Sequence, residues 1–162
     1  MTLRRFVFLL VILAAVLASP GAWARPKLLK SAPDLLAALK AGSEVHAVFH
    51  YKDMKLTDSE GKESSSPDAT GGMTLDTWEY FAAGVVGNPV GYLATSSAHL
   101  IRHPRHGYVL NYVKVSVYEN GQVKIVAQYL TPTDYSVKMD ETFTTVVADG
   151  KNQAGAFFYV GD

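Results

Sequence analysis

The sequence has 162 residues, 15 basic and 15 acidic side chains, a formal net charge of zero and no cysteine. A chain of this length suits one domain, and its balanced charge provides no basic surplus for binding nucleic acid or an anionic membrane. The lack of cysteine in the sequence excludes disulfides, a thiol nucleophile and a lipid-modified cysteine.

The first 24 residues have the features of a secretory signal peptide. Two arginines precede an apolar run over residues 6–18, and the small residues Ala22 and Ala24 follow before a cleavage point. The apolar run is shorter than the roughly 20 residues that span a bilayer. We therefore predict cleavage after Ala24, which leaves one mature β-domain over residues 25–162. We expect this domain in the periplasm or outside the cell, with no attachment to a membrane.

A short amphipathic helix is predicted between Ser31 and Gly42. Ser31 can cap its N-terminus, and Leu35, Leu36 and Leu39 form an apolar stripe with helical spacing. Gly42 suits the residue that ends the helix. Because a free helix of this length is only marginally stable in water, we expect it to pack on a sheet.

Two strands and a long polar segment follow the helix. Apolar residues alternate over residues 44–52, which predicts a strand with one buried face. Residues 53–72 are rich in serine, aspartate, glycine and proline, so we expect a mobile loop there. Residues 73–81, which include Trp78, are predicted to form the second strand.

The clearest element is a β-hairpin over residues 108–129, and its turn allows two registers. If the loop has two residues, Val117 faces Lys124. If the loop covers residues 119–121 and ends on a left-handed glycine, Val117 faces Val123. Because a shift of one residue moves every side chain to the other face, the apolar pattern decides between them. We predict the three-residue loop, which keeps the valines on one face.

Further strands are predicted at residues 92–101, 137–148 and 154–160. Short connections between successive strands favour an antiparallel meander. We therefore predict a mainly β fold in which about seven strands form a barrel or half-barrel, with the one short N-terminal helix packed on it.

Four short motifs lie in order along the chain. They are Asp34-Leu35-Leu36 followed by Ala38, Leu39 and Gly42; Gly71-Gly72-Met73 followed by Leu75; Asn111-Tyr112-Val113; and Lys138-Met139-Asp140-Glu141-Thr142-Phe143. Together they resemble the VirK family of small exported bacterial proteins, over nearly the whole mature chain. The resemblance implies a periplasmic or secreted location and a virulence-associated link to host interaction. It implies no biochemical activity, and no functional residue is carried over.

No motif in the sequence predicts catalysis, a cofactor or a metal site. His46 and His50 would lie roughly 13 Å apart along a strand, too far to share a metal ion. His103 and His106 could approach each other in a turn, but they would need a third ligand. The sequence also lacks a nucleophile elbow and a phosphate-binding loop. We therefore name no catalytic, cofactor-binding or metal-binding residue, and we rank an enzyme last.

Aromatic residues provide two of the three candidate ligand-binding positions. Tyr108, Tyr112 and Tyr118 share the hairpin face opposite the valines, and Trp78 lies on another strand. Such residues either pack across neighbouring strands or form a surface that binds a glycan or a protein. We name Tyr112 and Trp78 as the candidates.

Glu141 is the third candidate. Strand alternation points it inward between Met139 and Phe143, where a carboxylate is costly unless it has a partner. It either forms a structural pair, for which Lys114, Arg102 or a tyrosine hydroxyl could serve, or lines a ligand cavity. In a cavity, loss of hydration would raise its pKa.

These observations predict an exported, non-enzymatic, monomeric domain that binds a partner protein or a glycan. The alternative is a carrier that holds a small apolar or amphipathic ligand inside a β-barrel cavity.

Overall fold

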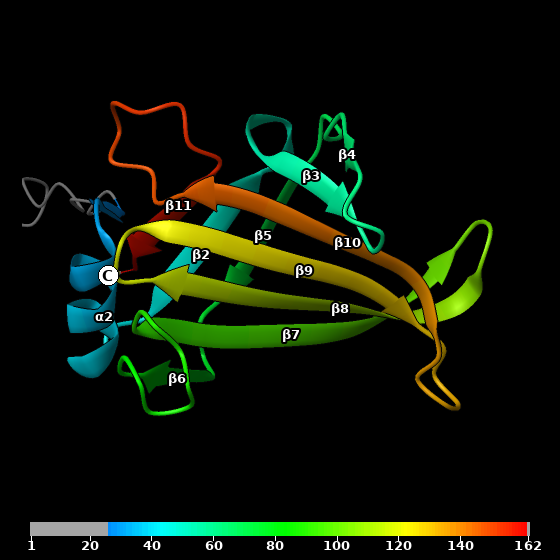
Figure 1. Ribbon diagram of the computed structural model, residues 1–162, viewed down its shortest axis with the longest axis horizontal. Coiled ribbons are helices and arrows are strands. Elements are labelled where there is room, and N and C mark those ends of the chain that lie inside the picture. Colours follow the sequence, from blue (N-terminus) through cyan, green and yellow to red (C-terminus); the bar gives the residue numbers. More distant parts are fainter. Residues whose placement is uncertain (1–25, 162) are drawn as a thin grey trace, which may run out of the picture.

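The computed structural model describes residues 26–161, which form two antiparallel β-sheets, one α-helix and one short 3-10 helix (Figure 1). The long sheet has the strand order β4-β3-β10-β9-β8-β7-β6, and the short sheet has the order β1-β11-β2-β5. The long-sheet strands are β3 (Lys55–Asp58), β4 (Glu63–Ser64), β6 (Trp78–Phe81), β7 (Tyr92–His103), β8 (Gly107–Tyr118), β9 (Gln122–Leu130) and β10 (Val137–Val146). The short-sheet strands are β1 (Lys27–Leu29), β2 (Val45–His50), β5 (Thr70–Thr74) and β11 (Ala156–Val160).

The helix α2 (Ala32–Lys40) confirms the predicted amphipathic helix. The backbone N–H of Asp34 donates to the Ser31 hydroxyl oxygen at 3.2 Å, which caps the first turn. Leu35 and Leu39 are buried against the sheets. Gly42 follows the helix with a φ of 79°, a left-handed conformation that glycine adopts without strain.

The core lies between the two sheets. Val45, Ala47 and Phe49 alternate toward it from β2, as predicted, and Phe158 of β11 meets Phe49 in an edge-to-face contact with ring centroids 6.4 Å apart. The predicted strand ends two residues early, because Tyr51–Asp53 turn into a 3-10 helix. We call the core side of the long sheet its inner face and the opposite side its outer face.

The hairpin of β8 and β9 has the predicted three-residue loop. Val117 pairs with Val123, and Val115 pairs with Ile125. All four of these side chains are buried. Gly121 has a φ of 84°, so the turn needs the left-handed conformation that was inferred from the apolar pattern.

The long sheet extends well beyond the short one. β7 and β8 have 12 residues each, whereas β2 has 6 and β11 has 5. At ~3.3 Å per residue, the long strands span about 40 Å and the short ones about 20 Å or less. Figure 1 shows the short sheet behind the end of the long sheet nearest α2, while β7 to β10 continue past it to the right.

Two predictions of local structure were wrong. The polar segment 53–72 is not a single loop, because it contains β3 and β4 and reaches into β5. Residues 73–81 do not form one strand: β5 belongs to the short sheet and β6 to the long one. Leu75, buried between them, anchors the crossing from one sheet to the other.

The strands of residues 26–161 form two separate sheets and no closed barrel. An antiparallel meander does run through β6, β7, β8, β9 and β10. A register shift between Val137 and Met139 pairs Val137 with Leu130, so Val137 is 54% exposed and does not share the inner face with Met139 and Phe143. The predicted signal peptide lies outside the described residues. None of the helices between residues 26 and 161 is both long and apolar enough to cross a membrane.

Candidate functional site

An open groove lies on the outer face of the long sheet, at the margin formed by β6, β7 and β8. Its volume is about 360 Å³, which falls within the range of roughly 300–1,000 Å³ typical of small-ligand sites. Its lining residues are Thr77, Trp78, Glu79, Phe81, Tyr92, Ala94, Thr95, Ser96, Tyr112 and Lys114. We call it the outer groove.

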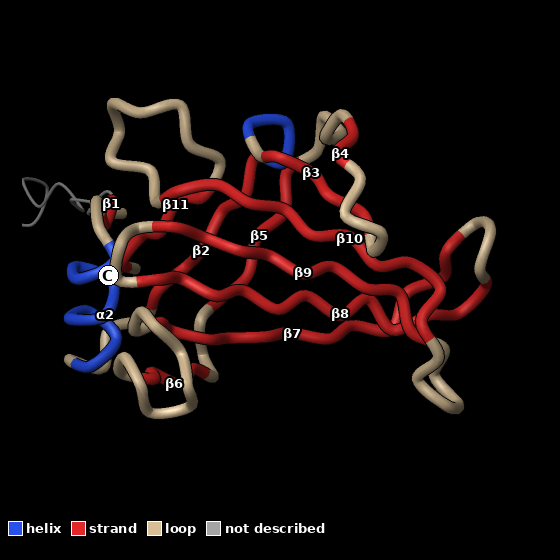
Figure 2. Tube along the Cα trace, viewed as in Figure 1, coloured by secondary structure: helices blue, strands red, loops and turns tan. Residues whose placement is uncertain are grey.

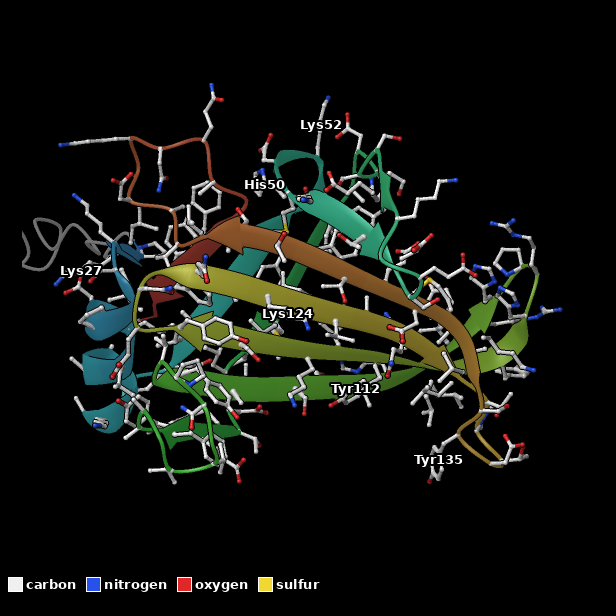
Figure 3. The ribbon with its side chains drawn as sticks, viewed as in Figure 1. Lys27, His50, Lys52, Tyr112, Lys124 and Tyr135 are labelled. Carbon is white, nitrogen blue, oxygen red and sulfur yellow. The ribbon has the colours of Figure 1, made fainter. Side chains whose placement is uncertain are left out.

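Small side chains on β7 create this groove between larger aromatic ones. Ala94 and Ser96 occupy successive outer-face positions, so the sheet surface is low between Tyr92 and Tyr112. The rings of Phe81 and Tyr92 stack with centroids 5.2 Å apart and close one end. Tyr112 stands at the other end, on the same face as Lys124, and Figure 3 labels both residues.

Polar groups lie beside these rings. Lys114 pairs across the strands with Ser96, and Glu79 pairs with Ala94. The salt bridges found within residues 26–161 involve neither Glu79 nor Lys114. The outer groove therefore offers an amine, a carboxylate and a hydroxyl next to aromatic faces. Such a surface suits a ligand with both apolar faces and many hydroxyl groups.

The structure brings Trp78 and Tyr112 to the same groove, although nothing in the sequence marks them as neighbours. By register Trp78 pairs with buried Thr95 and packs partly against the core, and it reaches the groove because β6 begins there. The sequence analysis did not name Phe81, and it considered Lys114 only as a partner for Glu141. The small residues at alternate positions of β7, between aromatic ones, were the available signal.

Glu141 lies apart from the outer groove, on the inner face of β10. It is half-buried and pairs across the strands with Ala127 and Asp58. Lys114 and Arg102 both lie on the outer face, so the predicted ion pair with either of them is wrong. The hydrogen bonds and salt bridges within residues 26–161 give the Glu141 carboxylate no partner, neither a cation nor a tyrosine hydroxyl.

The histidines do not gather into a metal site: the described residues include no cluster of three or more metal-ligating side chains. His103 and His106 stack in the β7–β8 turn with ring centroids 4.7 Å apart, and Tyr129 lies against His103 at 5.0 Å. The Arg105 backbone N–H donates to Nδ1 of His103 at 3.2 Å. Loss of hydration lowers the pKa of His103, and the nearby His106 and Arg105 add to this shift. His103 therefore stays mainly neutral at pH 7.

Comparison with known proteins identifies relatives of known fold. The family model described as "VirK protein" matches residues 28–135. The crystal structure of lpg1832, a VirK family protein from Legionella pneumophila, superposes with a TM-score of 0.60 at 16% sequence identity. The match covers 81% of this chain and 97% of that one. At this identity the likeness establishes the fold alone. No curated protein sequence matches the chain.

Proposed function

The chain belongs to the VirK family, and we propose that it is an exported, non-enzymatic binding protein whose outer groove holds a glycan. The observation that carries this proposal is that Trp78 and Tyr112 line one groove together with Lys114 and Ser96. Aromatic rings pack well on the C–H faces of a sugar, while hydroxyl, amine and carboxylate groups bond its hydroxyls.

Two features favour a glycan over the other predicted ligands. The outer groove is open to solvent, which suits a short sugar chain that continues beyond the protein. Its lining mixes apolar and polar groups. The predicted carrier would instead enclose an apolar ligand within a barrel, and the described strands form no closed barrel. The link to host interaction stays a prediction.

An oligosaccharide array, followed by titration calorimetry of any sugar that binds, tests the proposed ligand. Tyr112→Ala should weaken binding by about tenfold or more, because truncating an aromatic side chain that packs on a ligand commonly costs roughly 1–2 kcal/mol or more. The matched control is Tyr108→Ala, since Tyr108 lies on the same face of the same strand but outside the outer groove. Equal losses in both variants, or no sugar bound at all, would contradict the proposal.

Export is tested separately. If the chain is exported by its signal peptide, N-terminal sequencing of the protein from the periplasm or medium should begin at Arg25. A chain that keeps Met1 in the membrane fraction would show that the apolar run is an anchor.

A further inference from the structure

The long sheet has a free edge along much of β7. β6 pairs only with residues Tyr92 to Thr95, so β7 is the outermost strand from Ser96 to His103. Figure 2 shows this arrangement: β7 forms the lower margin of the long sheet, and β6 lies beneath only its left part. The other edge strands, β1, β4, β5 and β6, have only two to five residues each.

The register identifies which backbone groups are unpaired on this edge. The N–H of Glu119 donates to the carbonyl of Gly91 at 2.9 Å, so Gly91 directs its backbone toward β8. The β7–β8 register then runs unshifted to His103, so the odd residues of β7 keep facing β8. The even residues point the other way, and those beyond β6 have no strand beside them within the described chain. They are Ser96, Ala98, Leu100 and Arg102.

This edge lacks the usual protection against a further strand. Proteins commonly block exposed edges with proline, lysine, a bulge or a covering loop. Residues 96–101 contain neither proline nor a charged side chain, and the register has no bulge there. Leu100 is 60% exposed on the outer face. An unblocked edge of this length is a ready template for an added strand.

A small pocket opens beside the same edge, between the two sheets. Its volume is about 120 Å³. Ser97 and His99 of β7 line it, with Oγ and Nε2 3.0 Å apart, and its remaining walls include the apolar Phe49, Met73 and Val113. This volume is close to that of a cavity known to admit one benzene-sized group. We call it the inner pocket.

Tyr51 forms a fixed wall of the inner pocket. A Cβ on Gly71 would lie 2.9 Å from the Tyr51 hydroxyl, so glycine at that position lets the tyrosine ring lie against β5. Its ring centroid is 4.7 Å from that of Phe143, which holds it in place from the other side. The wall therefore exists before any ligand arrives.

We propose that the free edge of β7 binds an extended peptide segment of another protein, which adds a strand to the long sheet and inserts one apolar side chain into the inner pocket. In this mode, main-chain hydrogen bonds supply affinity, and a pocket for alternate side chains supplies specificity. A second copy of this chain fits less well. Its own β7 would bring Ser97 or His99 to a pocket that already holds the same two polar side chains, and would leave its apolar walls without an apolar contact.

The binding experiment uses a synthetic seven-residue peptide in which threonine alternates with valine around a central leucine. Amide hydrogen exchange, followed by NMR on the whole protein, reports on each strand position. At saturating peptide, the amides of Ser96, Ala98 and Leu100 should exchange at least about tenfold more slowly, because each gains a hydrogen-bond acceptor. Replacing the central leucine by threonine should weaken binding, because the inner pocket is left without an apolar group.

Ala98→Pro is the decisive variant. Proline removes an N–H that points away from the sheet, a position where an edge strand tolerates it. Binding should weaken by about tenfold or more, whereas the control Ala98→Ser, which keeps the N–H, should bind like the parent. If Ala98→Pro does not fold, a peptide N-methylated at the residues facing β7 provides the same test, and it should fail to bind.

Three outcomes would overturn this inference. The N-methylated peptide could bind as well as the unmodified one, or the three amides could keep their exchange rates at saturation. Slow exchange that depends on protein concentration without peptide would instead identify a second copy as the occupant. None of these results bears on the glycan proposal, since Tyr112→Ala leaves the edge backbone intact.

Discussion

The inner face of the long sheet differs between its two halves, although the same strands build both. In the half near α2, the inner positions of β8 and β9 hold Val115, Val117, Val123 and Ile125, all buried. In the far half, the inner positions of neighbouring strands hold Ser97, His99, Asn111 and Glu141. The change begins where Ser97, His99 and Asn111 border the inner pocket, and beyond them Val109 is again buried. Alternation along a strand decides which face a side chain occupies, but the groups packed opposite that face decide whether the side chain is shielded from water.

The largest expected effect comes from the covered half. Phe158 of β11 is 0% exposed and contacts Phe49. Phe158→Ala should lower the free energy of unfolding by roughly 3–5 kcal/mol, because it removes a large buried side chain and leaves a cavity. Urea denaturation measures this change. Leu100→Ala in the far half is the control, and it should stay within about 0.5 kcal/mol. Similar losses in both variants would show that the two halves are not distinct.

A matched pair of valines sharpens the comparison. Val115 is 0% exposed, whereas Val137 is 54% exposed. Val115→Ala should therefore cost roughly 1–3 kcal/mol of stability, and Val137→Ala should cost much less. Thermal and urea unfolding of the two variants test the difference. A large loss in Val137→Ala would mean that the outer face of the far half is covered in solution.

Glu141→Gln tests the polar character of the far half. The described residues give this carboxylate no cationic partner, so the variant should fold as stably as the parent, to within about 0.5 kcal/mol, or more stably. Glu63→Gln is the control, because Glu63 pairs with Lys55 at 2.5 Å on the surface, a contact worth at most about 1 kcal/mol. A loss above that value for Glu141→Gln would reveal a structural ion pair.

The smallest expected effect is a pH dependence of the free energy of unfolding, which arises at Asp134 in the turn between β9 and β10. Hydrogen bonds from Thr131 and Ser136 hold the pKa of Asp134 below its ordinary value of 3.8. Because this pKa is lower in the folded state than in the unfolded state, the charged carboxylate favours folding. That contribution is complete above the ordinary pKa and is lost as the pH falls through the folded-state value. Asp134→Asn should remove it, so parent and variant should converge in acid.

Unfolding curves at pH 7 and at successively lower pH measure this convergence. Thr131→Val should weaken the same dependence, since it removes the hydroxyl that donates to Asp134. A stability gap between parent and Asp134→Asn that stays constant through the acid range would contradict the assigned cause.

The elements predicted correctly were those whose signals are local. The cap at Ser31 and the left-handed Gly42 define α2 without reference to the rest of the chain. The register of β8 and β9 followed from the valine pattern, because only one alignment keeps Val117 opposite an apolar residue. In both cases, residues close together in the sequence are enough to predict the element.

The elements predicted wrongly depend on distant partners. β3 looks like part of a polar loop because only Leu56 is buried in it, and its pairing with β10 crosses a long stretch of sequence. The break between β5 and β6 has no proline or turn motif to mark it. The outer groove was hidden for the same reason, since Trp78 and Tyr112 become neighbours only through the pairing of β6 with β7 and of β7 with β8. The candidates were named from their chemistry, but their grouping required the topology.

The position of β11 determines when the protein can fold. It is the last described strand to be synthesised, yet it lies in the middle of the short sheet, where Val160 pairs with Lys27 on one side and with Val45 on the other. Until residue 160 has left the ribosome, β1 therefore has no strand partner and β2 has only β5. A chain that crossed a narrow translocation pore N-terminus first would lack β11 throughout the passage. The short sheet could then form completely only after exit.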